Sequence, residues 1–80
     1  MNSSTITALE ISFEAFGQKH KAYTHIENVG SIEPTLRNLC DTFYIEEVIT
    51  KEVSEERFKE FNIDNVEKWN QEVINRFEGK

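Results

Sequence analysis

Apolar and polar residues alternate along the first third of the chain, over residues 5–29. Alternation of this kind places apolar side chains on one face of a strand and polar side chains on the other. Gly17 and Gln18 lie in the middle, and glycine suits the first central position of a type II′ turn, which requires a positive φ. The pattern predicts a β-hairpin that turns at Gly17-Gln18 and brings Phe16 opposite Lys19.

This pairing separates the side chains of the hairpin into two sets. The apolar face holds Leu9, Ile11, Phe13, Ala15, His20, Ala22, Thr24 and Ile26. The mostly polar face holds Glu10, Ser12, Glu14, Phe16, Lys19, Lys21, Tyr23 and His25. Because an isolated hairpin is only marginally stable in water, we expect the rest of the chain to cover the apolar face.

A helix is predicted to begin between Ile32 and Pro34, because proline is tolerated in the first helical turn. An apolar stripe follows at helical spacing, made of Leu36, Leu39, Cys40 and Phe43. The stripe then breaks, since Ile45, Val48 and Ile49 fall on the opposite side of any continued helix. Three interpretations of residues 42–53 are therefore open: a third strand near 44–50, a continued helix with a second apolar stripe, or an irregular loop. Their β-branched and aromatic residues favour the strand, although Glu46 and Glu47 interrupt its alternation.

Ser54 is a plausible N-cap for a further helix, with Glu55 and Glu56 well placed for the helix dipole. Residues 62–65 look like a break, and Asp64 with Glu67 resembles a capping box for a last helix. That helix would carry the stripe Val66, Trp69, Val73, Ile74 and Phe77. The predicted fold is a single α+β domain over residues 1–80, frayed at 1–4 and 79–80. Its hairpin carries two or three helices packed on one face, in two layers.

The 80 residues carry a net charge of −6, which disfavours direct binding of nucleic acid and would attract a basic protein surface. A single cysteine rules out an intramolecular disulfide. No apolar run approaches the ~20 residues of a membrane span, and the N-terminal residues lack the features of a signal peptide. We therefore expect a cytoplasmic protein without membrane contact.

Few residues are candidates for chemistry. Cys40 lies on an apolar stripe, which indicates a buried small residue rather than a nucleophile. His20 and His25 fall on opposite faces of one strand and cannot easily share a metal ion. Glu52, Glu56 and Glu60 would align along one helical ridge, but ligands on one helix cannot wrap a cation. We expect no cofactor and no metal site.

These observations favour a small acidic, non-catalytic protein-binding module, such as an adaptor, an inhibitor or an accessory subunit of a larger protein. A homo-oligomeric assembly component is the first alternative, because free sheet edges and a leftover apolar stripe can pair with another chain. A small enzyme that uses Cys40 or a carboxylate is the second. The candidate partner-binding residues are Glu52, Glu56, Glu60, Ile45, Val48, Ile49, Phe16 and Tyr23.

Overall fold

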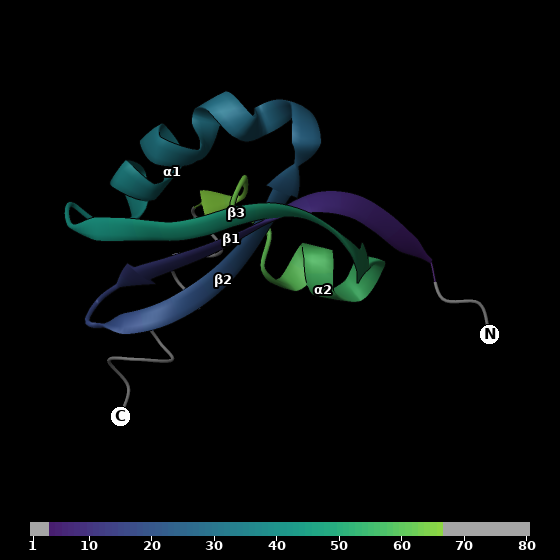
Figure 1. Cartoon of the computed structure of the whole chain (residues 1–80), viewed down its shortest axis with the longest axis horizontal. Helices are drawn as coiled ribbons and strands as arrows, with labels where there is room; N and C mark the ends of the chain where they lie inside the picture. The colour runs from purple at the N-terminus through teal and green to yellow at the C-terminus, as the bar shows by residue number, and fades with distance from the viewer. Residues whose placement is uncertain (1–3, 67–80) are drawn as a thin grey trace.

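The computed structural model describes residues 4–66 of the chain as an α+β fold (Figure 1). The elements in chain order are β1 (Thr5–Ala15), β2 (Gln18–His25), the 3₁₀ helix η1 (Ile26–Ser31), α1 (Ile32–Leu39), β3 (Phe43–Ser54) and α2 (Glu55–Glu60). The strands form one sheet in the order β2-β1-β3, and β1 pairs antiparallel with both neighbours. The predicted hairpin, the third strand and the start of the first helix are confirmed.

The hairpin turns one residue earlier than the sequence pattern predicts. Its central residues are Phe16 and Gly17, with φ values of 54° and 74°, and Ala15 faces Gln18 across the turn. Positive φ at both central positions is the type I′ pattern, whose twist matches that of the flanking strands. Lys19 therefore faces Glu14 rather than Phe16. Because the pairing slides by an even number of positions, every side chain keeps its predicted face.

The second strand is shorter than expected, because β2 ends at His25 and the following residues form η1. In η1 the side-chain amide of Asn28 donates to the Asp64 carboxylate over 2.8 Å. The hydroxyl of Thr24 also donates to Asp64. These bonds connect the end of β2 to the C-terminal part of the described chain.

A β-bulge in β3 explains why Glu46 and Glu47 interrupt the alternation. Ser12 faces Glu47, but the next residue, Phe13, faces Ile45, which leaves Glu46 without an opposite residue. One extra residue shifts the alternation of side chains between the two faces by one position, so the pattern before the bulge is out of step with the pattern after it. Ile45 therefore lies on the same face as Phe13 and packs against the core there.

The helices lie on both faces of the sheet, so the prediction that they cover one face is wrong (Figure 1). On the face predicted to be apolar, the buried residues are Leu9, Ile11, Phe13, Ala15, Ala22, Ile32, Leu36, Leu39 and Ile63. On the other face, α2 inserts Phe58 into a smaller cluster with Ala8, Tyr23 and Val53. The face predicted to be polar therefore has an apolar half at the end where α2 lies.

The capping role of Ser54 is confirmed, since its Oγ accepts a hydrogen bond from the Arg57 backbone N–H over 3.1 Å. The predicted break after this helix is present, and Asn62 forms an isolated parallel bridge with Tyr23. Glu67, the second residue of the predicted capping box, and the stripe residues Trp69, Val73, Ile74 and Phe77 lie outside the described residues.

Candidate functional site

Two aromatic side chains are exposed together at the hairpin tip. Phe16 is 43% exposed in the turn, and Tyr44, at the start of β3, is 65% exposed. Tyr44 faces Glu14 across the sheet, two residues before Phe16. A shallow hollow lies between them and is lined by Glu14, Ala15, Phe16, Gly17, Thr42, Phe43 and Tyr44. We call this region the tip surface.

The backbone of Phe16 has the left-handed conformation that a bulky residue rarely adopts, since its Cβ approaches the following carbonyl oxygen. The side chain nevertheless stays 43% exposed. The Phe16 ring approaches the His20 ring edge to face, with ring centroids 6.2 Å apart. Asparagine is the usual residue at this position of a type I′ turn. Packing within the described residues therefore does not explain why a phenylalanine stands here.

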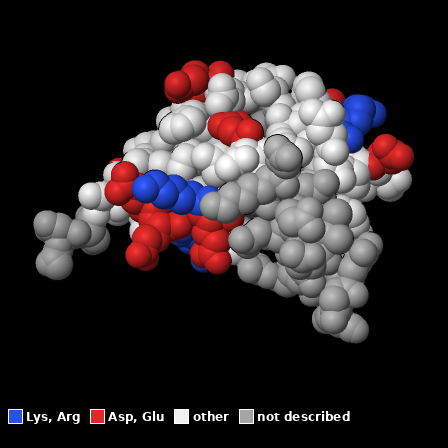
Figure 2. Space-filling model, turned by 180° about the vertical axis from the view of Figure 1, so that it is seen from behind, with Lys and Arg blue, Asp and Glu red and all other residues white. Residues whose placement is uncertain are grey.

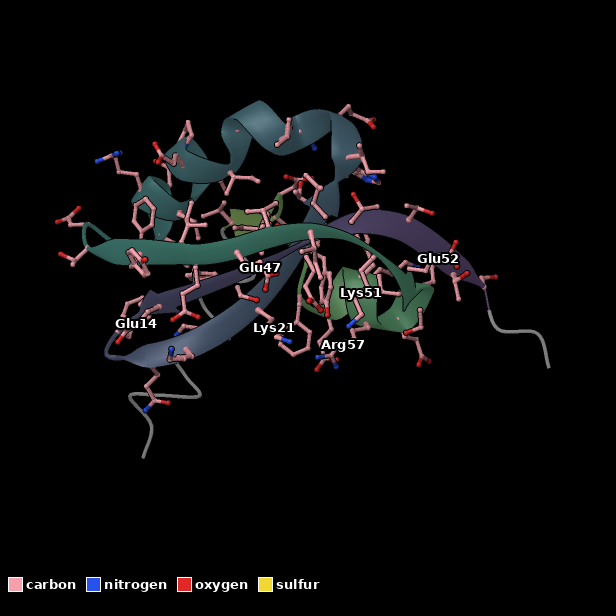
Figure 3. All side chains as sticks on the ribbon, viewed as in Figure 1. Glu14, Lys21, Glu47, Lys51, Glu52 and Arg57 are labelled. Carbon is pink, nitrogen blue, oxygen red and sulfur yellow. The ribbon has the colours of Figure 1, made fainter. Side chains whose placement is uncertain are left out.

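Charged side chains of both signs flank the tip surface, and most of them are acidic. Glu14 lines its hollow, and Figure 3 shows that residue at the end of the hairpin. A second hollow on the other side of Tyr44 includes Glu33, Arg37 and Asp41. The guanidinium of Arg37 lies over the ring of Phe43, 5.9 Å from its centroid. Lys19 faces Glu14 and forms an ion pair with Glu46, so the carboxylates of Glu14, Glu33, Asp41 and Glu46 outnumber the cations Arg37 and Lys19 around the tip.

Tyr23, the other predicted partner contact, is not part of this surface. It is only 2% exposed, because α2 covers it, so the prediction of an exposed anchor is wrong. Its hydroxyl donates to Glu10 Oε2 over 2.8 Å and accepts from Arg57 Nε over 3.1 Å. Tyr23 therefore has a structural role between β1, β2 and α2.

Glu10 is the buried centre of a charge network that sequence reasoning missed. The residue is 4% exposed, and Lys51 Nζ and Lys21 Nζ lie 3.6 Å and 3.8 Å from its carboxylate oxygens. Figure 3 shows Lys21, Lys51 and Arg57 grouped on the face of the sheet that carries α2. Burial acts to raise the pKa of Glu10, but the Tyr23 hydroxyl and the two lysines outweigh it, so the pKa is lowered. The sequence signal would have been Glu10 opposite Tyr23, which appears only when the turn is placed at Phe16-Gly17.

The three acidic residues predicted to share a helical ridge do not do so. Glu52 belongs to β3, whereas Glu56 and Glu60 belong to α2. All three are exposed. Figure 2 shows a group of acidic side chains at the end of the molecule where α2 lies. The acidic character of this end remains, but the predicted single ridge is wrong.

The second apolar stripe also divides in the structure. Ile45 packs against the core, whereas Val48 and Ile49 are exposed on opposite faces of β3. A strand alternates its side chains, so neighbours such as Val48 and Ile49 cannot form one stripe. Ile49 is therefore separated from the other two, whereas Ile45 and Val48 share a face and line one hollow with Val29 and Ile32.

The remaining candidates have structural surroundings. Cys40 is half-buried, and its Sγ donates to the Thr42 carbonyl over 3.0 Å. Burial is the main reason why the pKa of the Cys40 thiol is raised. His20 stacks near Phe13, with ring centroids 5.4 Å apart, whereas His25 lies 4.9 Å from the ring of Phe58. The two histidines therefore lie on opposite faces, as their spacing predicts.

Over residues 4–66, no three or more His, Cys, Asp or Glu side chains gather in a way that could hold a metal ion. Among the helices that the structure describes, none combines the length and the apolar character needed to cross a bilayer. Comparison of the chain with known proteins gives no matching family model, no matching curated protein and no matching solved structure.

Proposed function

We propose that this chain is a small, acidic, non-catalytic protein-binding module that contacts its partner through the tip surface. Adaptor, inhibitor and accessory subunit are the roles of this class. The observation that carries the proposal is Phe16, a bulky aromatic residue kept exposed in a left-handed turn conformation that a smaller residue would adopt at lower cost.

The side chains at the tip surface are of the type that dominates protein interfaces. Aromatic residues supply large contact areas at a small cost in side-chain entropy, and they are enriched among the residues that contribute most to binding. Phe16 in the turn and Tyr44 on β3 both line one hollow, so a partner side chain can insert between them. The neighbouring carboxylates favour a partner segment that carries Lys or Arg.

Two features favour this proposal over an enzyme. The raised pKa of Cys40 keeps its thiol protonated near neutral pH, and the thiolate is the nucleophilic form. The buried carboxylate of Glu10 is already paired with Tyr23 and two lysines. Its lowered pKa suits a permanently ionised group and not a general acid or base near pH 7.

The test is affinity capture of the tagged protein from its native lysate, with mass spectrometry of the recovered proteins. The double variant Phe16→Ser with Tyr44→Ser removes the tip aromatics. Its matched control is Ile26→Ser with Val29→Ser, which removes two exposed apolar residues from η1. We expect the control, but not the tip variant, to recover the same partner as the wild type. Equal recovery by both variants would contradict the proposal.

Ionic strength gives a second reading of the same experiment. Charges on a protein surface are screened beyond ~8–10 Å at physiological salt, so a partner selected by the acidic flanks should be recovered less at high salt. If recovery is insensitive to salt but lost in the tip variant, the partner contacts the tip aromatics and does not depend on basic residues for binding.

A further inference from the structure

β3 forms one edge of the sheet, and within residues 4–66 no segment pairs with its outer side. The strand is 12 residues long, and Val53 is its one buried residue. The opposite edge is partly occupied, since the Tyr23 N–H donates to the Phe61 carbonyl and the Tyr23 carbonyl accepts from the Ile63 N–H. An unpaired strand edge is a template for another strand. β3 is therefore the edge where a strand can add.

The positions of the outward backbone groups follow from the hydrogen bonds of Tyr23. Its N–H and C=O point away from β1, so those of its cross-strand neighbour Glu10 point toward β3. Glu10 faces Ile49, whose backbone groups therefore point back toward β1. Because successive residues alternate in direction, the N–H and C=O groups of Val48 and Thr50 point away from the sheet.

The centre of β3 is complementary to itself. Residues 47–51 read Glu-Val-Ile-Thr-Lys, with opposite charges at equal distances from Ile49. If two copies pair antiparallel with Ile49 facing Ile49, each Glu47 faces a Lys51 and each Val48 faces a Thr50. Opposite charges and β-branched pairs are both favourable cross-strand neighbours. Glu47, Ile49 and Lys51 share the face that carries α2, and Figure 3 shows the two charged side chains there.

We propose that two copies of this chain form a dimer by antiparallel pairing of residues 47–51 of β3, which makes the sheet continuous across both copies. Val48 and Thr50 form the hydrogen-bonded pairs, whereas Ile49 meets its own copy where side chains come closest. The pairing ends at the bulge, because Glu46 would face Glu52 of the second copy. The contact is short, so the dimer dissociates on dilution.

Sedimentation velocity over a range of protein concentrations tests the dimer. We expect the mass to rise with concentration from 9.4 kDa toward twice that value. The substitution Thr50→Pro removes an outward N–H that β1 does not use, and proline is tolerated on edge strands for that reason. This variant should stay monomeric at every concentration, with an unchanged circular dichroism spectrum.

Charge substitutions test the pairing register independently. Glu47→Lys places two lysines opposite each other at both ends of the contact, and we expect dimerisation about tenfold weaker. Glu52→Lys is the matched control: it changes the net charge equally on the same strand, but it should not weaken dimerisation, because it only replaces the repulsion between Glu52 and Glu46 at the end of the contact. Lys51 is left unchanged in both variants, because its Nζ lies 3.6 Å from the carboxylate of the buried Glu10.

Two results would overturn the dimer. One is a wild-type chain that stays monomeric at all concentrations, which would leave the β3 edge to a strand of a different protein. The other is an association that Thr50→Pro leaves unchanged, or that Glu52→Lys weakens as much as Glu47→Lys does. None of these variants alters Phe16 or Tyr44, so failure of the dimer and failure of the tip surface are measured separately.

Discussion

The hydroxyl of Tyr23 donates a hydrogen bond to the buried carboxylate of Glu10 over 2.8 Å, which joins β2 to β1 beneath α2. The same hydroxyl accepts from Arg57 Nε on α2. One oxygen atom thus connects three elements. A buried ionised group requires such partners, because burial without them costs several kcal/mol.

The substitution Tyr23→Phe should lower the free energy of unfolding by about 1–3 kcal/mol, because it removes one hydrogen-bond donor from the buried Glu10 and the acceptor of Arg57 Nε. Urea unfolding measures this change. Tyr44→Phe is the matched control, since it removes the same atom from a side chain that is 65% exposed. The control should stay within about 0.5 kcal/mol of the wild type. Equal effects of the two substitutions would contradict the role of the buried hydroxyl.

Glu10 should make stability depend on pH in the acidic range. Its pKa in the folded state is lowered from an ordinary value of 4.5. The ionised form therefore stabilises the fold fully above about pH 4.5, and this contribution disappears as the pH falls through the folded-state pKa.

Glu10→Gln isolates this effect, because glutamine can still accept from Tyr23 but does not titrate. The measurement is the free energy of unfolding of both proteins between neutral and acidic pH. We expect the advantage of the wild type over the variant to shrink below about pH 4.5. An advantage that is constant with pH, or that grows in acid, would show that the pKa of Glu10 is not lowered.

The turn should be more stable without its phenylalanine. Phe16→Asn places the preferred residue of a type I′ turn at a φ of 54°, and we expect a gain of about 1 kcal/mol. For a domain of this size that gain raises the Tm by about 4–8 °C. Gly17→Ala should have the opposite effect, a loss of about 1 kcal/mol at a φ of 74°. A Phe16→Asn variant that is less stable than the wild type would show that Phe16 stands there for stability.

The bonds of Asp64 should hold the segment after α2 against the sheet. Asp64→Ala leaves the hydroxyl of Thr24, which is almost fully buried, without its carboxylate acceptor. We expect a loss of about 1–3 kcal/mol. Hydrogen exchange locates the effect, because the amides of Tyr23 and Ile63 bond across this junction. Those amides should exchange faster in the variant, whereas the amides that pair β1 with β3 should change less. Equally faster exchange at all these amides would contradict a local role of Asp64.

The faces of the hairpin were predictable, but its pairing was not. Alternation assigns each side chain to a face, and a slide by two positions preserves that assignment. Gly17 satisfies both candidate turns, since it suits the first central position of type II′ and the second of type I′. Only the structure shows that Phe16 adopts a positive φ. The Glu10–Tyr23 pair was missed for this reason.

The prediction that all helices cover one face of the sheet is wrong because the hydrophobic pattern distinguishes the two faces only by their overall polarity. Ala8 and Tyr23 share a face with Glu10, Lys21 and Glu14, so that face reads as polar overall. Its apolar half is enough to bury Phe58 from α2. The bulge at Glu46 was likewise hidden, because a bulge shows in the sequence only as broken alternation, which a loop or a helix also produces.

The sequence predicts one of the two aromatic residues of the tip surface, Phe16, but not the other, Tyr44. Phe16 was recognised as an aromatic residue on the polar face, and it is exposed in the structure. The sequence pattern predicts Tyr44 within the third strand but does not identify it as a partner contact. Its position beside Phe16 depends on the pairing of β3 with β1, which brings Tyr44 opposite Glu14. Contacts between strands that are distant in sequence require the sheet order, which patterning does not determine.

Photo-crosslinking from the tip tests the proposed function most directly. Tyr44→p-benzoylphenylalanine places the reactive group on the tip surface, and the same substitution at Val29, an exposed residue of η1, provides the control. Both proteins are irradiated in native lysate and the crosslinked species are identified by mass spectrometry. The account predicts one dominant crosslinked protein from position 44, absent from position 29 and lost when Phe16→Asn is added. Crosslinks that form equally from both positions, or that persist with Phe16→Asn, would contradict it.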